Sequence, residues 1–165
     1  MIGVGELKKI LPHRYPILLI DRVTELVPGE RLTALKAVTC NEPWYRTMPP
    51  DAGEEAHDYP GVLLVESWCQ AAAVLGGRSA GTLRTQAGQV PLLGGVSDVR
   101  LSGHARPGDV VEHRVRLVRD FGDTLIFEGE STVAGRLIAE IGRATMALRP
   151  GTDMGRASQG RPAAP

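Results

Sequence analysis

The segment that most constrains the fold is GVLLVESWCQAAAVLGG, residues 61–77. It is rich in Ala and Leu, shows no alternation of apolar and polar residues, and is apolar on nearly all faces, which predicts a helix covered by other structure on every side. Gly76 and Gly77 are expected to end it. Its one charged residue is Glu66, and burying a carboxylate without compensation costs on the order of several kcal/mol. Glu66 therefore indicates a functional site or a dedicated hydrogen-bond partner.

The rest of the chain predicts a short amphipathic helix in residues 1–10 and a set of antiparallel strands. Branched apolar runs or alternating patterns, separated by turn signals, predict the strands 17–26, 31–40, 90–101, 109–120, 123–134 and 136–149. The irregular loop 41–60 holds four prolines and five acidic residues. We expect one α+β domain over residues 1–149, in which a curved sheet wraps the central helix. Flexible segments are expected at 78–89 and in a tail at 150–165.

Composition excludes several classes of function. Lys and Arg (19) balance Asp and Glu (19), so there is no basic surface of the kind that binds nucleic acid. No apolar run reaches the length of about 18 residues that spans a bilayer, and the first ten residues lack the pattern of a secretory signal. The four histidines have no ligand spacing, so neither a metal site nor a cofactor is expected. These features predict a soluble cytoplasmic protein.

Five stretches carry a resemblance to a known family: LPHRYPILLIDRV (11–23), NEPW (41–44), PGVLLVESWCQAAAVL (60–75), RPGD (106–109) and GESTVAGRLIAE (129–140). In this order, across residues 7–149, they resemble the 3-hydroxyacyl-acyl-carrier-protein dehydratases of fatty-acid synthesis. The resemblance implies the hotdog fold, a six-stranded antiparallel sheet wrapped around a long central helix. It also implies a homodimer, with a hexamer built as a trimer of dimers left open. In such a dimer, a histidine of one subunit faces an acid of the other.

The resemblance further implies a reaction, the removal of water across C2 and C3 of a 3-hydroxyacyl thioester carried by acyl carrier protein or CoA, which gives a trans-2-enoyl thioester. Glu66 matches the family's acid and would protonate the leaving C3 hydroxyl. The backbone N–H groups of Gly61 and Val62 match the turn that binds the thioester carbonyl. Gln70 lies one helical turn after Glu66 and is expected to orient its carboxyl, while Tyr59 is expected to line the acyl tunnel.

The chain departs from the family at the catalytic base. The family's histidine lies in a Gly-His-Phe-Pro segment after NEP, and the aligned residue here is Met48, which has no proton-transferring group. The loop that follows is longer than the family's and contains His57, three residues before Pro60. We expect His57 to replace the missing base and Met48 to contact the substrate. His13 is expected to make structural hydrogen bonds near the mouth of the site.

Three functions remain open on such a fold. The first is the dehydratase, in which His57 supplies the base. The second is another acyl-thioester enzyme, such as a thioesterase, in which Glu66 activates water and no histidine is needed. The third is a non-catalytic protein that binds an acyl chain or serves as a partner subunit. The acidic residues of loop 41–60 would repel an acidic carrier protein and favour a CoA thioester, and the divergence favours a specialised fatty-acid or polyketide pathway.

Overall fold

The computed structural model describes residues 1–78 and 89–150. The predicted tail beyond residue 150 lies outside these ranges, as does most of the stretch predicted to be flexible. The elements are β1 (Ile2–Gly3), α1 (Val4–Ile10), β2 (Arg22–Val27), β3 (Arg31–Ala37), the 3-10 turns η1 (Pro43–Tyr45) and η2 (Glu54–His57), α2 (Gly61–Arg78), β4 (Gln89–Leu101), β5 (Val110–Asp120), β6 (Thr124–Val133) and β7 (Arg136–Pro150).

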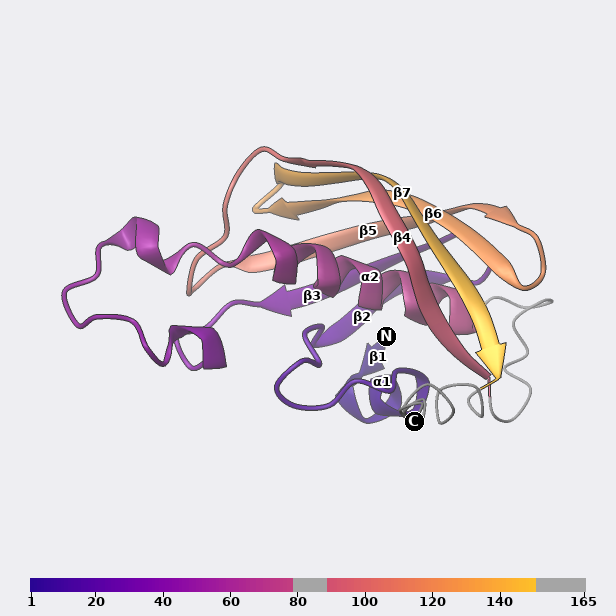
Figure 1. Ribbon diagram of the computed structural model, residues 1–165, viewed down its shortest axis with the longest axis horizontal. Helices are drawn as coiled ribbons and strands as arrows, with labels where there is room; N and C mark the ends of the chain where they lie inside the picture. The colour runs from indigo at the N-terminus through magenta and orange to yellow at the C-terminus, as the bar shows by residue number, and fades with distance from the viewer. Residues whose placement is uncertain (79–88, 151–165) are drawn as a thin grey trace, which may run out of the picture.

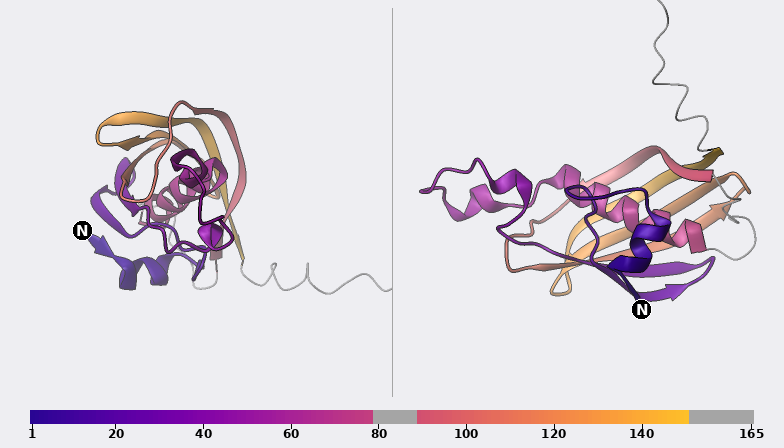
Figure 2. Two further views of the ribbon diagram at one scale, coloured as in Figure 1. Left: turned by 90° about the vertical axis from the view of Figure 1, so that its left-hand side faces the viewer. Right: turned by 90° about the horizontal axis from the view of Figure 1, so that it is seen from below.

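The strands form one antiparallel sheet in the order β1-β2-β3-β5-β6-β7-β4. Figure 1 shows the sheet lying across α2, and the end-on view in Figure 2 shows that it curves around the helix. The six predicted strands are all present, which confirms the expected sheet around a long central helix. The two-residue β1, which pairs with β2, is an addition that the sequence pattern did not indicate. The strand β4 forms the opposite edge of the sheet.

The central helix α2 is buried along most of its length, as its apolar composition predicts. Trp68 has no exposed surface, and its indole Nε1 donates a hydrogen bond to the carbonyl oxygen of Arg114 on β5, at 3.1 Å. Gly129 on β6 permits this close packing, because a Cβ at that position would collide with the Arg114 carbonyl and would lie 3.1 Å from Trp68 Cζ2. Within the described ranges, no helix is long and apolar enough to cross a membrane.

The first predicted strand is wrong over its first half. Residues 17–21 were expected to be extended sheet, but β2 begins only at Arg22. The side-chain amide of Gln70 takes the backbone groups that a strand would pair, since it accepts a hydrogen bond from Leu19 N–H (2.9 Å) and donates one to Ile17 O (2.7 Å). The segment therefore runs beside α2 as an irregular strap that is bonded to the helix at Ile17 and Leu19 and joins β3 only at Asp21, whose N–H donates to Leu35 O at 2.9 Å.

Candidate active site

Glu66 lies on the second turn of α2 and keeps 30% of its side chain exposed, in a helix that is otherwise buried along most of its length. Gln70, one turn later and 1% exposed, donates a hydrogen bond from Nε2 to Glu66 Oε1 at 2.8 Å. This is the hydrogen bond that the sequence predicts between them. Because the same amide is bonded to the backbone of Ile17 and Leu19, it cannot rotate freely. The Glu66 carboxyl is therefore oriented by a Gln70 side chain that is itself fixed in place.

His13 lies at the site, near whose mouth the sequence places it, but its contact with Glu66 is not predicted. Its Nε2 lies 3.4 Å from Glu66 Oε1, and its side chain, like that of Glu66, is 30% exposed. The other ring nitrogen, Nδ1, is buried and has no hydrogen-bond partner within the described ranges. His13 and Glu66 are far apart in the sequence, and the path of the chain between α1 and β2 brings them together. The HRYP motif was a signal that this histidine lies near the mouth of the site.

The first turn of α2, which precedes Glu66 in the helix, has backbone N–H groups with no backbone partner among the described residues. The carbonyl of Pro60 accepts hydrogen bonds from the N–H groups of Leu63 (2.9 Å) and Leu64 (3.0 Å). The N–H groups of Gly61 and Val62 belong to the first turn, whose donors have no acceptor within a helix. The Val62 side chain is 75% exposed, so this end of the helix is open to an approaching molecule.

Glycine at position 61 keeps the helix start close to the sheet. A Cβ added there would lie 2.5 Å from Leu101 Cδ1, at the end of β4. The end of a leucine side chain can move, so this contact resists a larger residue without forbidding it. The first turn of α2 thus packs directly beside the edge strand.

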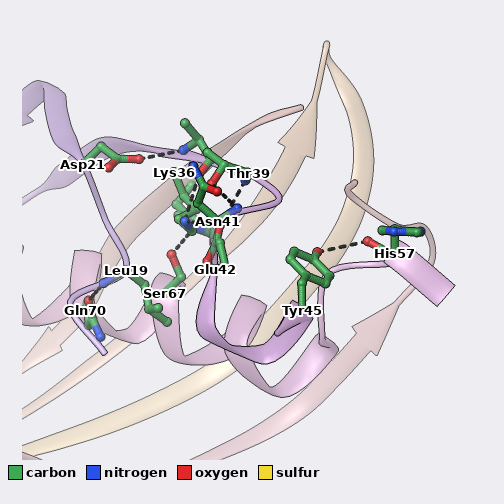
Figure 3. A network of polar contacts seen from close by, with 12 residues as sticks. Leu19, Asp21, Lys36, Thr39, Asn41, Glu42, Tyr45, His57, Ser67 and Gln70 are labelled. Atoms are coloured by element: carbon green, nitrogen blue, oxygen red, sulfur yellow. Dashed lines mark hydrogen bonds and ion pairs between the residues drawn. The ribbon is translucent and has the colours of Figure 1, made fainter. Parts of the chain in front are cut away.

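A buried ion pair fixes the chain leading to the loop 41–60. Lys36 Nζ on β3 lies 2.7 Å from Glu42 Oε1, and each of these side chains is 8% exposed. The backbone N–H of Thr39 donates to the same Glu42 oxygen at 3.2 Å (Figure 3). Lys36 Nζ also lies 5.5 Å from the centre of the Tyr59 ring, which links the two ends of the loop.

Tyr59 lies two residues before the start of the helix and is 5% exposed. Its ring meets the Trp44 ring edge to face at a centroid distance of 5.4 Å, and its backbone N–H donates to Ala105 O at 2.7 Å. Burial raises the pKa of the Tyr59 hydroxyl far above its ordinary value. The hydroxyl has no hydrogen-bond partner among the residues that the structure describes. Tyr59 is thus a packing group beside the helix start, and its role toward an acyl chain stays a prediction.

His57 lies in the η2 turn, on the part of the loop that extends beyond the sheet in Figure 1. Its Nδ1 lies 3.0 Å from Gly53 O, and its own carbonyl accepts a hydrogen bond from Tyr45 Oη at 3.0 Å. Figure 3 shows His57 and Gln70 at opposite ends of this polar region. Within residues 1–78 and 89–150, Glu66 of the same chain is not among the contacts of His57.

Met48 is half-buried near the start of the same loop, and its backbone N–H donates to Tyr45 O at 3.1 Å. The far end of the loop is anchored by an ion pair in which Arg106 Nε lies 2.6 Å from Asp58 Oδ1. The loop is therefore tied to the body of the protein on both sides, with His57 next to the second tie.

His113 on β5 is buried between two serines and lies away from the solvent. Ser67 Oγ lies 2.8 Å from its Nε2, and Ser131 Oγ lies 2.8 Å from its Nδ1. Burial, with a smaller effect of the Lys36 charge, lowers the pKa of His113 to about 3, so the ring is neutral near neutral pH. None of the three side chains has exposed surface, so this cluster stabilises the fold and does not meet a substrate.

No group of His, Cys, Asp and Glu side chains in the described part of the chain is arranged to hold a metal ion. The chemistry that the arrangement offers is that of a partly exposed carboxyl, an adjacent imidazole and free backbone donors. Such a set can transfer a proton and can bind a carbonyl oxygen.

Comparison with known proteins identifies the family. Residues 11–142 match the model of the FabA-like domain. The 3-hydroxyacyl-[acyl-carrier-protein] dehydratase FabZ of Myxococcus xanthus is 38% identical over 140 residues, covering 84% of this chain and 87% of the relative. FabZ of Campylobacter curvus is 38% identical over 144 residues, covering 85% of this chain and 93% of the relative.

Solved structures agree with the fold. The dehydratase heterocomplex ApeI:P from Xenorhabdus doucetiae superposes with a TM-score of 0.70 at 19% identity, covering 93% of this chain and 97% of that chain. A mutant of the thioesterase PA1618 from Pseudomonas aeruginosa superposes with a TM-score of 0.63, also at 19% identity, covering 90% of this chain and 94% of that chain. The chain has the predicted hotdog fold, and it belongs to the FabA-like family, which it shares with the FabZ dehydratases.

Proposed function

We propose that the protein is a dehydratase that removes water from a 3-hydroxyacyl thioester and releases a trans-2-enoyl thioester. The observation that carries this proposal is the carboxyl of Glu66, which is 30% exposed on an otherwise largely buried helix and is oriented by Gln70 at 2.8 Å. The family membership supports the same conclusion, since FabZ relatives are 3-hydroxyacyl-acyl-carrier-protein dehydratases. Glu66 in protonated form would donate its proton to the C3 hydroxyl, which leaves as water.

The other steps follow from the helix start and from a histidine. The thioester carbonyl accepts hydrogen bonds from the N–H groups of Gly61 and Val62, which stabilises the enolate that forms when C2 loses its proton. A neutral imidazole removes that proton, and we assign this role to His57. The electron pair of the C2–H bond becomes the C2–C3 double bond as the C3–O bond breaks. Met48 and Tyr59 are assigned to the wall that contacts the acyl chain.

A second copy of the chain would bring His57 to the site, since His57 does not contact Glu66 of its own chain. No strand of the described residues pairs with the outer side of the edge strand β4, and exposed apolar side chains lie along it and beside it on the first turn of α2. These are Leu93, Val99, Leu101 and Val62. An edge of this kind is suited to pairing with another strand. We propose a homodimer joined along β4, with a trimer of such dimers as the hexameric alternative.

The donor of the acyl group is an acyl carrier protein or CoA. Asp51, Glu54 and Glu55 are exposed on loop 41–60, which projects from the body of the protein in Figure 1. Their charge would repel an acidic carrier protein, and it would also oppose the phosphates of CoA, so the choice between the two donors rests on the assay below. The compartment that we propose is the cytoplasm, and the pathway is a specialised branch of fatty-acid or polyketide synthesis.

A thioesterase is the second candidate, and the replacement of the family's histidine by Met48 favours it. A hydrolase can use the Glu66 carboxylate to activate water and needs no imidazole as base. The same site residues would then release a free acid and a thiol instead of an enoyl thioester. A protein that binds the acyl chain without turning it over is the remaining outcome of the test.

The test offers 3-hydroxyacyl and saturated acyl thioesters of CoA and of acyl carrier protein to the purified protein, and it measures both enoyl formation and thiol release. We expect water loss that is abolished by Glu66→Gln and strongly reduced by His57→Ala. Thiol release that survives His57→Ala would instead establish the thioesterase. Binding without either product would refute catalysis, and water loss that is indifferent to His57→Ala would refute the assigned base.

A further inference from the structure

We propose that His13 is a positioning residue of this site. It directs the Glu66 carboxyl so that Oε2, and not Oε1, carries the proton that is delivered to the substrate. The proposal rests on the proposed function and concerns the same site, but it adds a residue from the same chain that the family's histidine–acid pair does not include.

The two oxygens of Glu66 have different surroundings. Oε1 faces two nitrogen atoms, Gln70 Nε2 at 2.8 Å and His13 Nε2 at 3.4 Å. The Gln70 nitrogen is an amide donor, so Oε1 is an acceptor in this arrangement. A protonated carboxyl has a single O–H, and an oxygen that already accepts a hydrogen bond from the Gln70 amide and faces a second nitrogen is a poor place for it. The proton therefore lies on Oε2.

The ring of His13 has one protonation form that fits its surroundings. Nδ1 is buried and has no partner in the described part of the chain. An imidazolium would place an unpaired N–H donor there, which costs about 1–3 kcal/mol or more for a charged group. The neutral ring with its proton on Nε2 leaves Nδ1 as an unpaired acceptor, which costs less than an unpaired donor on a charged ring, and it directs a donor toward Glu66 Oε1. In this form the ring is a hydrogen-bond donor to Glu66 and not a base.

The backbone around His13 is held in place before any substrate arrives. The Arg14 guanidinium donates to three carbonyl oxygens, those of Lys8 (2.9 Å), Leu11 (2.9 Å) and His13 itself (2.7 Å). The Arg14 carbonyl in turn accepts from the N–H of Ile17 at 2.8 Å. Ile17 O is the oxygen that Gln70 binds, so His13 and Gln70 belong to one connected support. Preorganisation of this kind is what a proton donor needs.

The experiment compares His13→Ala with His13→Gln, whose side-chain amide can place an N–H near the position of Nε2. The matched control is His104→Ala, which removes an exposed histidine from the loop between β4 and β5. We expect His13→Ala to lower kcat for water loss by about 10- to 100-fold with KM changed by less than about threefold, and His13→Gln to recover most of that loss. In the Glu66→Gln background, His13→Ala should have no further effect, because it acts through Glu66.

A second readout does not depend on turnover. In a crystal structure of the His13→Ala protein, the Glu66 carboxyl should take more than one orientation, while in His104→Ala it should keep the wild-type one. If the wild type removes no water from any 3-hydroxyacyl thioester, the proposed function fails, and the crystal structure still decides the role of His13. The proposal itself is overturned by a single unchanged Glu66 orientation, by an unchanged kcat in His13→Ala, or by His13→Gln being as inactive as His13→Ala.

Discussion

The buried imidazole of His113 should make the stability of the protein depend on pH in a way that can be calculated. The ring has no exposed surface and bonds Ser67 and Ser131 through its two nitrogens, so one nitrogen must donate and the other must accept. Burial, with a smaller contribution from the Lys36 charge, lowers its pKa to about 3. In the unfolded chain the same group has a pKa of about 6.5.

The direction and the size of the pH effect on the free energy of unfolding follow from these two pKa values. Above the unfolded value both states are neutral, and the contribution of His113 to the free energy of unfolding is fully present. As the pH falls below about 6.5 the unfolded chain binds a proton that the folded chain does not, so stability is lost until the folded pKa is reached. Between pH 7 and pH 5 this loss amounts to about 2 kcal/mol.

The assay is urea unfolding at a fixed protein concentration at pH 7 and pH 5, for the wild type and for His113→Gln. The variant has no titrating group at this position, so the other groups contribute equally to both proteins and cancel in the comparison. We expect the wild type to lose about 2 kcal/mol more than His113→Gln between the two pH values. An equal loss in both proteins would show that the ring is not held neutral in the folded state.

Two further changes test the packing and the charges that support the site. Lys36→Met should lower the free energy of unfolding by about 3–5 kcal/mol because it leaves the buried Glu42 carboxylate without its ion-pair partner. The double variant with Glu42→Leu should recover most of that loss. A double variant that is no more stable than Lys36→Met in urea unfolding would contradict this expectation. Gly129→Ala should lower the free energy of unfolding in urea by about 3 kcal/mol, since its Cβ would collide with the Arg114 carbonyl. Gly5→Ala, where a Cβ has open space, should be neutral or stabilising in the same assay.

The sequence predicts the arrangement of elements well, because each depends on a local pattern. The helix expected at 61–77 is Gly61–Arg78, and the strand expected at 109–120 is Val110–Asp120. The pattern fails at residues 17–21, where branched apolar residues favour a strand but a side-chain amide from α2 takes the backbone groups. Such a contact joins segments far apart in sequence, and no local pattern records it.

The sequence likewise predicts one part of the candidate site and not the other. The hydrogen bond between Gln70 and Glu66 follows from helical spacing, and it is present. The place of His13 beside Glu66 does not follow from spacing, because it depends on the path of residues 11–21 between α1 and β2. His57 is close in sequence to the helix start, which predicts a place in the site, but η2 turns its ring toward Gly53 and Tyr45. Its role as base remains a prediction that requires a second subunit.

The role of Glu66 as proton donor is tested most directly by the rate of enoyl thioester formation in the wild type and in Glu66→Gln. Both proteins must be shown to be folded and of the same oligomeric state. Glutamine keeps the shape of the side chain and its contact with Gln70 but cannot donate a carboxylic proton. We predict that the wild type converts a 3-hydroxyacyl thioester and that Glu66→Gln is slower by at least about 100-fold, within the range of a lost general acid. Equal rates in the two proteins would contradict it.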